Sequence, residues 1–292
     1  MSRRSWLQLL ALAALWGASY LFIKVGLRDL SPGMLVFLRI ALGALVLAPL
    51  AVRTRAFRQL RGHGRDVAVL AAVQVAAPFI LIALGERSIS SSLAGILVST
   101  VPIFTALIAL RADPEERVGG WGLGGVALGI VGVALVVGVD VSGSGLLGAL
   151  AVVLASVGYA VGGLFLKRRL RGVPPVALTT GTLATSALMV APAALATLPG
   201  HVPSAGPALA VAALGCGGTG VAFVIFYRLI AEVGPSKASL VTYVVPGFAL
   251  AYGVMVLGET ITLATLIGLA LIVGGSWLAA EGRLPALRRA PA

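Results

Sequence analysis

Charged residues are scarce in this sequence. Only 11% of its 292 residues are Asp, Glu, Lys or Arg, whereas 59% are hydrophobic, and the mean hydropathy is +1.05. A soluble domain carries about 25% charged residues, so a single water-solvated globule is excluded. One membrane-spanning helix needs about 20 apolar residues. The chain therefore has room for roughly ten spans and none for a large soluble enzyme domain.

Cysteine and histidine are nearly absent. The single cysteine, Cys216, cannot form an internal disulfide, and the two histidines, His63 and His201, fall in different loops. We find no set of His, Cys and acidic residues at metal-ligand spacing around either histidine. The sequence therefore predicts no metal site and no cofactor. An intramembrane enzyme would need a nucleophile with a base, paired acids or a metal set within the spans, so we expect no enzymatic activity.

Apolar runs bounded by charge, glycine or proline predict an all-α integral membrane protein with ten spanning helices. The first run follows Arg3 and Arg4 and could also be read as a cleaved signal peptide, although the internal repeat described below argues against cleavage. The predicted helices cover residues 6–26, 32–52, 67–85, 91–110, 119–138, 146–166, 175–198, 206–228, 237–257 and 260–280.

The net charge of +12 is explained by topology. If the N-terminus is cytoplasmic, 18 of the 22 basic residues fall in the termini and loops on the cytoplasmic side, whereas the outer loops contain only Arg28 and Arg87. Basic residues accumulate in cytoplasmic loops of membrane proteins and contact anionic lipid there. We expect a bacterial inner-membrane protein with both termini in the cytoplasm, membrane lipid as a partner, and no nucleic-acid partner.

The chain contains an internal repeat. A shift of 143 residues aligns the segment that begins at Trp16 with the segment that begins at Tyr159, with 13 identities in 36 positions, and a shift of 144 aligns Pro102 with Pro246. We place the first five-helix repeat at 1–140 and the second at 141–292. Because five is odd, the second copy enters the membrane from the opposite side. Inverted repeats of this kind are a recurring plan of secondary transporters.

The motifs of the chain resemble a known family. They are the opening WGASYLFIKVGL, the pair Leu38 and Arg39, the run AGILVSTVPIFTALIAL, the run SKASLVTYVVPGFALAYGVMVLGE and the closing GLALIVGGSWLA. Together they are similar to the ten-helix EamA-type transporters of the drug/metabolite transporter superfamily. The resemblance implies two inverted bundles around a central cavity, with the fifth and tenth helices packed outside. It also implies export of amino acids or other small metabolites.

Arg39 lies about seven residues inside the second predicted helix, where a cation costs at least about 2.5 to 3.5 kcal/mol on insertion scales. It could attract a substrate carboxylate or phosphate, alone or together with Lys24. Alternatively, it could bind backbone carbonyls where helices break, or extend to the outer surface. Lys24 lies at the outer boundary, where lysines are usually interfacial anchors.

Pro102 and Pro246 are expected to kink helices at matching mid-span positions, to free backbone carbonyls and to act as gating positions. Hydroxyls precede both prolines, although these could also bind their own helix backbone. Aromatic and polar side chains within other spans could line the same pathway or pack in the core. The candidates for substrate binding are Trp16, Ser19, Tyr20, Lys24, Arg39, Gln74, Ser99, Thr100, Tyr159, Thr242 and Tyr243.

None of the ten acidic residues falls near the middle of a predicted span. A proton-coupled antiporter commonly needs such a carboxylate, so we expect transport that is uncoupled or coupled in a way that the sequence hides. The function that fits best is alternating-access export of amino acids with apolar or aromatic side chains by a monomer. The alternatives are a proton-coupled exporter of drugs or other metabolites and a channel-like membrane scaffold. Small faces rich in glycine, such as Gly124 and Gly125, are expected to let helices pack closely.

Overall fold

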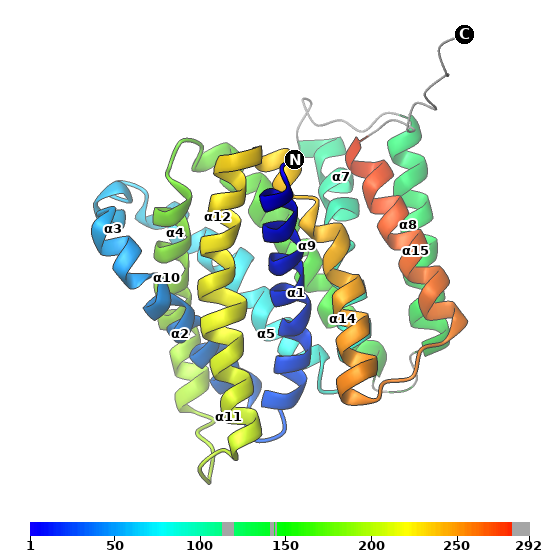
Figure 1. Ribbon diagram of the computed structural model, residues 1–292, viewed down its shortest axis with the longest axis horizontal. Helices are drawn as coiled ribbons and strands as arrows, with labels where there is room; N and C mark the ends of the chain where they lie inside the picture. Colours follow the sequence, from blue (N-terminus) through cyan, green and yellow to red (C-terminus); the bar gives the residue numbers. More distant parts are fainter. Residues whose placement is uncertain (113–119, 141–142, 144, 282–292) are drawn as a thin grey trace.

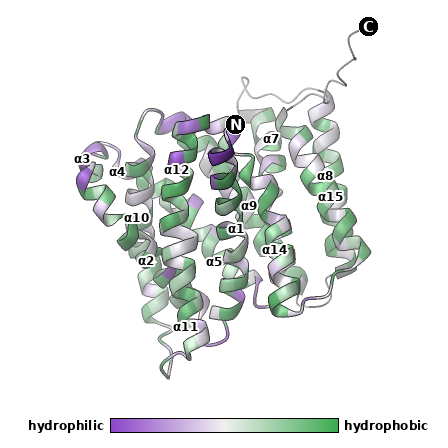
Figure 2. Ribbon diagram, in the orientation of Figure 1, coloured by the Kyte–Doolittle hydropathy of each residue, from purple (hydrophilic) through white to green (hydrophobic). Residues whose placement is uncertain are grey.

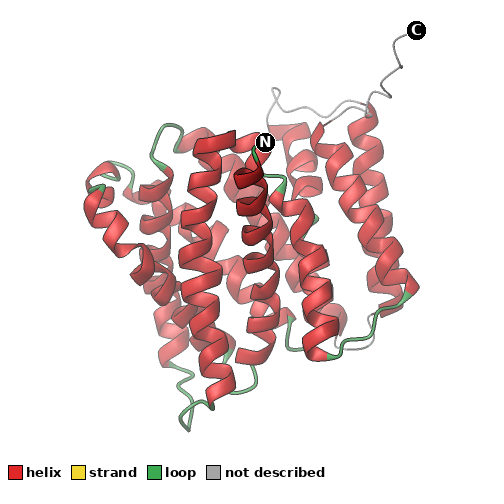
Figure 3. Ribbon diagram, in the orientation of Figure 1, coloured by secondary structure: helices red, strands yellow, loops and turns green. Residues whose placement is uncertain are grey.

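The computed structural model describes residues 1–112, 120–140, 143 and 145–281 (Figure 1). The regular elements in these ranges are all helices (Figure 3). The first repeat comprises α1 (Arg3–Gly26), α2 (Pro32–Arg53), α3 (Ala56–Gln59), α4 (Gly64–Ala71), η1 (Ala72–Ala76), α5 (Ala77–Gly85), α6 (Ser91–Val98), α7 (Val101–Ala112) and α8 (Gly120–Asp140). The second comprises α9 (Gly145–Arg169), α10 (Pro175–Leu195), α11 (Ala205–Ala212), η3 (Ala213–Val221), α12 (Ala222–Val233), α13 (Pro235–Ala238), α14 (Val241–Leu257) and α15 (Leu263–Glu281).

The ten predicted spans all correspond to helices. In the described residues, nine helices are long and apolar enough to cross a membrane. The remaining span, the ninth in chain order, is the shorter apolar helix Val241–Leu257. The predicted ninth span, 237–257, begins four residues before this helix does. The chain instead forms the short helix α13, and a turn separates it from α14. The all-helical membrane architecture is confirmed.

Serine residues fix where three helices of the first repeat begin. The side chains of Ser2, Ser31 and Ser90 each accept a hydrogen bond at 3.1 Å from the backbone N–H three residues ahead. These bonds satisfy N–H groups that have no partner within the helix. Pro32 follows Ser31 at the first helical position, where its missing N–H removes no helix bond.

The fourth span is divided, but not at its proline. The helical pattern is interrupted at Ser99 and Thr100, between α6 and α7, and Pro102 lies in the first turn of α7. A proline in the first turn removes no intrahelical hydrogen bond. The expectation of matching mid-helix kinks was therefore wrong for Pro102. Pro246 does lie inside its helix, α14.

Two wide-turn π-helical segments interrupt the third and eighth spans. The shift of 143 residues that relates the repeats places Ala72–Ala76 over 215–219, which lies inside the second π-helix, Ala213–Val221. Such segments are uncommon and concentrate at functional sites. The hydropathy pattern did not predict them, because it does not distinguish a π-helical turn from an α-helical one.

Contacts between helix ends show that the repeats are inverted. Lys24, near the end of α1, donates a hydrogen bond to the carbonyl of Glu86 at the end of α5. Gly148, near the start of α9, packs against Gly85 in the same region. The end of α1 and the start of α9 therefore lie on the same side of the molecule, so these equivalent helices of the two repeats run in opposite directions.

The helix pairs follow the same twofold relation. α2 packs on its repeat mate α10, and α8 packs on its mate α15 at one edge of the bundle, on the right in Figure 1. This confirms the expectation that the fifth and tenth helices lie outside the other eight. Gly125 is one of the glycines that let this pair approach closely, because a Cβ there would lie 2.6 Å from the backbone nitrogen of Ala279.

Hydrophilic residues are concentrated toward the helix ends and the loops, and the middle of the bundle is predominantly hydrophobic (Figure 2). The side of the molecule where α1 begins is called the N-terminal side below, and the side where α1 ends is called the Lys24 side.

Candidate substrate cavity

A cavity of about 420 Å³ lies between the two repeats. This volume falls within the range of small-molecule sites, about 300–1,000 Å³. Helices from both copies contribute to the wall, including α1, α2, α5, α9, α10, α12 and α14. The wall is largely apolar, and Arg39 is the only formally charged side chain among its described residues.

The cavity opens on the N-terminal side. Ser239 and Thr242 line it and are exposed, and both follow the end of α12. That end lies beside the start of α1, because Glu232 accepts hydrogen bonds from Ser5 and Gln8. In contrast, Ile23 and Ile82 line the opposite end of the cavity and are buried, with 1% and 3% of their surface exposed. The cavity is therefore closed toward the Lys24 side.

Hydrogen bonds between the repeats strengthen the closed side. The carboxylate of Glu259 accepts hydrogen bonds from the backbone nitrogens of Ser91 and Ser92 at 2.7 and 3.0 Å. This places a negative charge at the N-terminus of α6, where it is stabilised by the helix dipole. In the loops, the Asp29 carboxylate accepts two bonds from Ser204 at 2.6 and 2.7 Å. These bonds to Ser204 lower the pKa of Asp29.

Arg39 is held at the cavity wall by two contacts. Its Nε donates a 3.1 Å hydrogen bond to the hydroxyl of Thr219, and its guanidinium carbon lies 3.8 Å from the ring centroid of Phe79. The Thr219 hydroxyl in turn donates to the carbonyl of Leu214, five residues earlier in the π-helix η3. The second repeat thereby positions the single cation contributed by the first.

The surroundings of Arg39 decide between its alternative roles. The residue is 8% exposed, so it does not extend to the outer surface. Its described contacts are a hydroxyl and an aromatic ring, not the backbone carbonyls of a broken helix. Its terminal nitrogens have no hydrogen-bond partner among the described residues and are not among the buried unpartnered atoms. These nitrogens can donate to an anionic group in the cavity.

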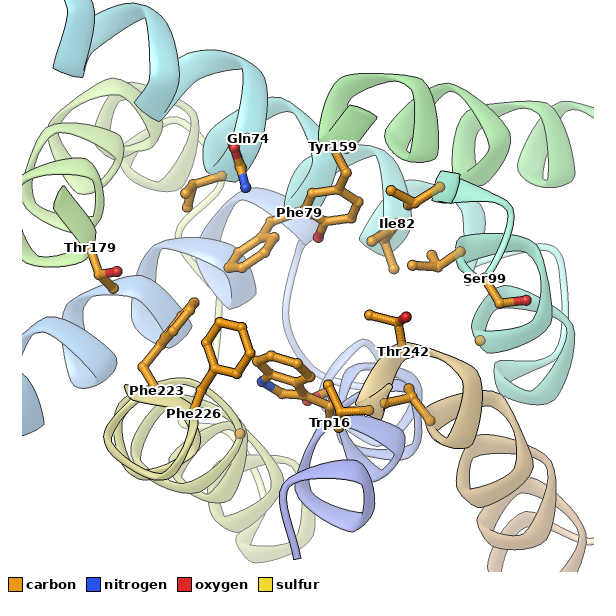
Figure 4. A pocket seen from close by; sticks show the side chains of 18 of the residues that line it. Trp16, Gln74, Phe79, Ile82, Ser99, Tyr159, Thr179, Phe223, Phe226 and Thr242 are labelled. Carbon is orange, nitrogen blue, oxygen red and sulfur yellow. The ribbon is translucent and has the colours of Figure 1, made fainter. Parts of the chain in front are cut away.

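One wall of the cavity is aromatic. The Trp16 ring lies 5.3 Å from Phe226 and 6.2 Å from Phe223, measured between ring centroids. Phe223 stacks on Tyr227, whose hydroxyl donates to Thr179. Figure 4 shows Trp16, Phe223 and Phe226 together, across the cavity from Phe79 and Tyr159. An apolar or aromatic group of a substrate would find complementary surface here.

The opposite wall carries polar groups. Gln74 comes from the π-helix η1 and Tyr159 from α9, and both side chains lie at the cavity in Figure 4. The Gln74 side-chain carbonyl oxygen is buried and has no hydrogen-bond partner among the described residues. α9 approaches this amide closely at Gly162, where a Cβ would lie 2.6 Å from that oxygen. Gln74 therefore has unused hydrogen-bonding capacity next to the cavity.

Two of the predicted hydroxyls line the cavity as hydrogen-bond acceptors. Ser19 donates to the carbonyl of Leu15 and Ser99 donates to the carbonyl of Ile96. Because each hydroxyl has one proton and two lone pairs, each retains the capacity to accept a hydrogen bond. Thr182, the repeat mate of Arg39, also lines the cavity, so the two equivalent positions face the same space with different chemistry.

Most of the predicted substrate-binding and gating residues are brought together by the fold. The cavity wall contains Trp16, Ser19, Tyr20, Arg39, Gln74, Ser99, Pro102, Tyr159, Thr242 and Pro246.

Three predicted residues are absent from the wall. Lys24 donates to the backbone carbonyls of Glu86 and Ile89 at 2.5 and 2.7 Å, beyond the closed end of the cavity. Thr100 is fully buried and its hydroxyl bonds the carbonyl of Leu97. Tyr243 follows the wall residue Thr242 on α14, and consecutive helical residues point about 100° apart.

Three phenylalanines of the wall, Phe79, Phe223 and Phe226, were not among the predicted site residues. Hydropathy places them within spans but does not tell a core face from a cavity face. The spacing of Phe223, Phe226 and Tyr227 at three and four residues could have indicated a continuous aromatic face on one helix.

The described part of the chain contains no group of three or more His, Cys, Asp or Glu residues that could hold a metal ion. Cys216 is half-buried and is not a wall residue.

Comparison with known proteins gives consistent results. The uncharacterized transporter YoaV of Bacillus subtilis is 25% identical over 280 residues, covering 93% of this chain and 95% of the relative. The uncharacterized inner membrane transporter YedA of Escherichia coli strain K12 is 29% identical, covering 91% and 87% of the two chains. A probable amino-acid metabolite efflux pump of Salmonella typhimurium is 24% identical, covering 95% of each.

A solved crystal structure superposes on the fold with a TM-score of 0.68 at 21% identity, covering 96% of this chain and 98% of the other. The sequence model of the EamA-like transporter family matches twice, at residues 4–138 and 146–280. These two matches account for nearly the whole chain and confirm the resemblance seen in the motifs. The protein is a membrane transporter, not an enzyme, and it belongs to the EamA-like transporter family.

Proposed function

We propose that this transporter exports amino acids with apolar or aromatic side chains across the bacterial inner membrane by alternating access. The observation that carries the proposal is the position of Arg39, a single buried cation in a largely apolar cavity. A carboxylate would bind the free guanidinium nitrogens, and the apolar side chain would pack against Trp16, Phe223 and Phe226.

The zwitterionic character of an amino acid suits the remaining polar groups. Its ammonium group needs hydrogen-bond acceptors, and the Ser19 and Ser99 hydroxyls of the wall retain acceptor capacity. The described wall contains no carboxylate, which makes cationic drugs poorer candidates. One distant relative is named as a probable amino-acid metabolite efflux pump, which supports the same substrate class.

The direction of access follows from the charge distribution. The positive-inside rule predicts that both termini are cytoplasmic, and the cavity opens on the N-terminal side. In this reading the structure is an inward-open state, ready to load substrate from the cytoplasm. Exchange of the two repeat conformations would close this side and open the Lys24 side. Since the cavity is formed within one chain, the proposal needs no second subunit.

The test is transport of radiolabelled phenylalanine, leucine and alanine by purified protein in liposomes, with nucleotides and quaternary ammonium compounds as competitors. We expect saturable phenylalanine transport that the other apolar amino acids compete for. Competition by cations alone would support a multidrug exporter instead. Flux far above about 10³ molecules per second per protein would support a channel, because alternating access requires a conformational cycle on the microsecond to millisecond timescale or slower.

A matched pair of variants tests the role assigned to Arg39. Arg39→Gln should reduce phenylalanine transport, whereas Arg28→Gln, which removes an exposed arginine of a loop on the closed side, should not. Folding of both variants is checked by size-exclusion chromatography and thermal unfolding. Loss of folded protein in Arg39→Gln alone would indicate a structural role for Arg39 and would remove the main support for this proposal.

A further inference from the structure

The closed side of the transporter contains a buried carboxyl group that the proposed substrate site does not use. Glu86 follows α5 immediately, and its residue is 0% exposed. Both of its carboxyl oxygens are buried without a hydrogen-bond partner among the described residues. An ionised carboxylate in such a place lacks both water and hydrogen-bond donors, which is strongly unfavourable.

Lys24, whose ammonium bonds the Glu86 backbone, does not pair with this carboxyl group. Lys24 on α1 uses its ammonium to donate to the backbone carbonyls of Glu86 and Ile89, at 2.5 and 2.7 Å. No ion pair between Lys24 and the Glu86 carboxylate occurs within 4.0 Å in the described structure. The ammonium is therefore used by backbone carbonyls, and both Glu86 carboxyl oxygens are left without a hydrogen-bond partner among the described residues.

Other charged groups around Glu86 lie on separate elements. Arg39 on α2 and Glu259 in the segment between α14 and α15 act on it electrostatically, as does Lys24, and the Tyr20 phenol of α1 also lies near it. α9, which packs on α5, presents Tyr159 to the cavity. Burial raises the pKa of the Glu86 carboxyl, Lys24 and Arg39 oppose this, and Glu259 adds to it.

Glu86 lies at the division between the cavity and the Lys24 side. Its backbone N–H bonds the carbonyl of Ile82, a residue of the closed end of the cavity, so Glu86 is one helical turn beyond that end. A few residues further along, Ser91 and Ser92 bind Glu259 of the other repeat. Separation of the repeats on this side would therefore admit water to the Glu86 carboxyl.

We propose that Glu86 is a proton-binding residue, protonated while the Lys24 side is closed and ionised when that side opens. Opening hydrates the carboxyl group, its O–H bond breaks, and the proton passes to water on the Lys24 side while the electron pair stays on the carboxylate. Closing takes up one proton from the same side. This inference rests on the alternating access proposed above and adds a proton to its cycle. Because the proton leaves and returns on the same side, one cycle carries no net proton across the membrane, and the inference concerns pH-dependent opening of that side, not proton-driven transport.

The sign of the pH dependence follows from this exchange. A hydrated glutamate has a pKa of about 4.3, and the closed state binds the proton more tightly. The contribution of proton binding to the closed state is therefore at its full size below about pH 4.3. The closed state becomes less favoured by up to tenfold per pH unit above that value, until the pKa of the closed state is reached. Rising external pH should open the Lys24 side.

The direct test is infrared difference spectroscopy of the purified full-length protein in liposomes, between mildly acidic and alkaline pH, without any substrate. We expect a carbonyl-stretch band of a protonated carboxylic acid that disappears at alkaline pH. This band should be missing in Glu86→Gln and present in Asp66→Asn, which removes a half-buried carboxyl near the start of α4. An identical band in wild type and Glu86→Gln would overturn the proposal.

Thiol labelling in intact cells tests the link to opening. In a Cys216→Ser background, Ile82→Cys places a thiol at the closed end, and a membrane-impermeant maleimide is applied outside. After normalisation to the exposed position Arg28→Cys, labelling should rise with external pH when Glu86 is present and stay low at all pH values in Glu86→Gln. If Glu86→Gln does not fold, Glu86→Asp should retain the rise with a shifted midpoint. A rise that persists unchanged in Glu86→Gln would overturn the inference.

Both readouts are independent of the substrate. Absence of phenylalanine transport with a Glu86-dependent band would contradict the proposed substrate and leave the proton site in place. Phenylalanine transport without that band would contradict the proton site and leave the proposed substrate in place.

Discussion

The guanidinium carbon of Arg39 on α2 lies 3.8 Å from the ring centroid of Phe79 on the neighbouring helix α5. Both residues line a cavity that contains no other formally charged side chain among its described residues. A cation over an aromatic face is stabilised by about 0.5–2 kcal/mol, depending on how far it is removed from water. Together with the Thr219 hydroxyl, this contact holds the guanidinium at the cavity wall.

Removal of the Arg39 charge should weaken substrate binding. A hydrogen bond to a charged group contributes about 1.5–3 kcal/mol, so Arg39→Gln should raise the KM for phenylalanine roughly 10- to 100-fold. Arg39→Lys should recover only part of this, because an ammonium lacks the planar fork. Initial rates in liposomes measure both. An equal KM in the three proteins would show that Arg39 does not contact the substrate.

Loss of the Thr219 hydroxyl should raise the KM for phenylalanine by a smaller factor than loss of the Arg39 charge. Thr219→Val keeps the shape of the side chain but removes the acceptor for Arg39 Nε. A net contribution of about 1 kcal/mol predicts a roughly fivefold higher KM with similar thermal stability. The matched control is Thr180→Val, since Thr180 is buried and bonds only the carbonyl of Val176 among the described contacts. A similar KM increase in both variants would point to a general packing effect.

Close packing of α8 and α15 should make two adjacent glycines differ. A Cβ at Gly125 would lie 2.6 Å from a backbone nitrogen of α15, whereas a Cβ at Gly124 would meet nothing within 4 Å. Gly125→Ala should destabilise the protein by about 1–3 kcal/mol. Gly124→Ala should be neutral or stabilise it by up to about 1 kcal/mol. Thermal unfolding in detergent compares the two, and equal melting temperatures would contradict the glycine packing described for this pair.

The Asp29 link between loops predicts a pH dependence at low pH. Hydrogen bonds from Ser204 lower the pKa of Asp29 in the folded protein, below the value of about 3.9 for a free aspartate. Its stabilising effect is therefore fully present above about pH 4 and is lost as the pH falls through the lowered pKa. Wild type and Asp29→Asn should differ in melting temperature at neutral pH and converge in acid. A difference that grows on acidification would contradict this assignment.

Removal of the Glu259 carboxylate should open the closed side. Glu259 accepts from two backbone nitrogens and the hydroxyl of Ser92. Glu259→Ala leaves these donors without an acceptor, so Ile82→Cys should be labelled from outside several-fold faster than in the parent protein. The control is Glu232→Ala, which removes a carboxylate between the repeats on the N-terminal side. Faster labelling in Glu232→Ala alone would reverse the assignment of the closed side.

The sequence alone determined the class of the protein. Long apolar segments must form helices in a membrane, because backbone groups there have no water to bind. The ten spans and the two repeats therefore follow from hydropathy and self-similarity. Arg39 was found in the same way, since a cation inside an apolar span needs a special environment. The start of α14 and the break before α7 were not predicted, because local helix boundaries depend on turns that hydropathy does not describe.

Only the tertiary structure decided which side chains share a space. Thr219 and Arg39 are 180 residues apart in the chain, and Thr219 lies in the π-helix η3, which has no signal in the hydropathy pattern. Glu86 shows the same limit. Its place at the end of a span predicts exposure to water, because sequence gives the depth of a residue along a helix. Its burial comes from the lateral packing of neighbouring helices and loops, which only the folded chain defines.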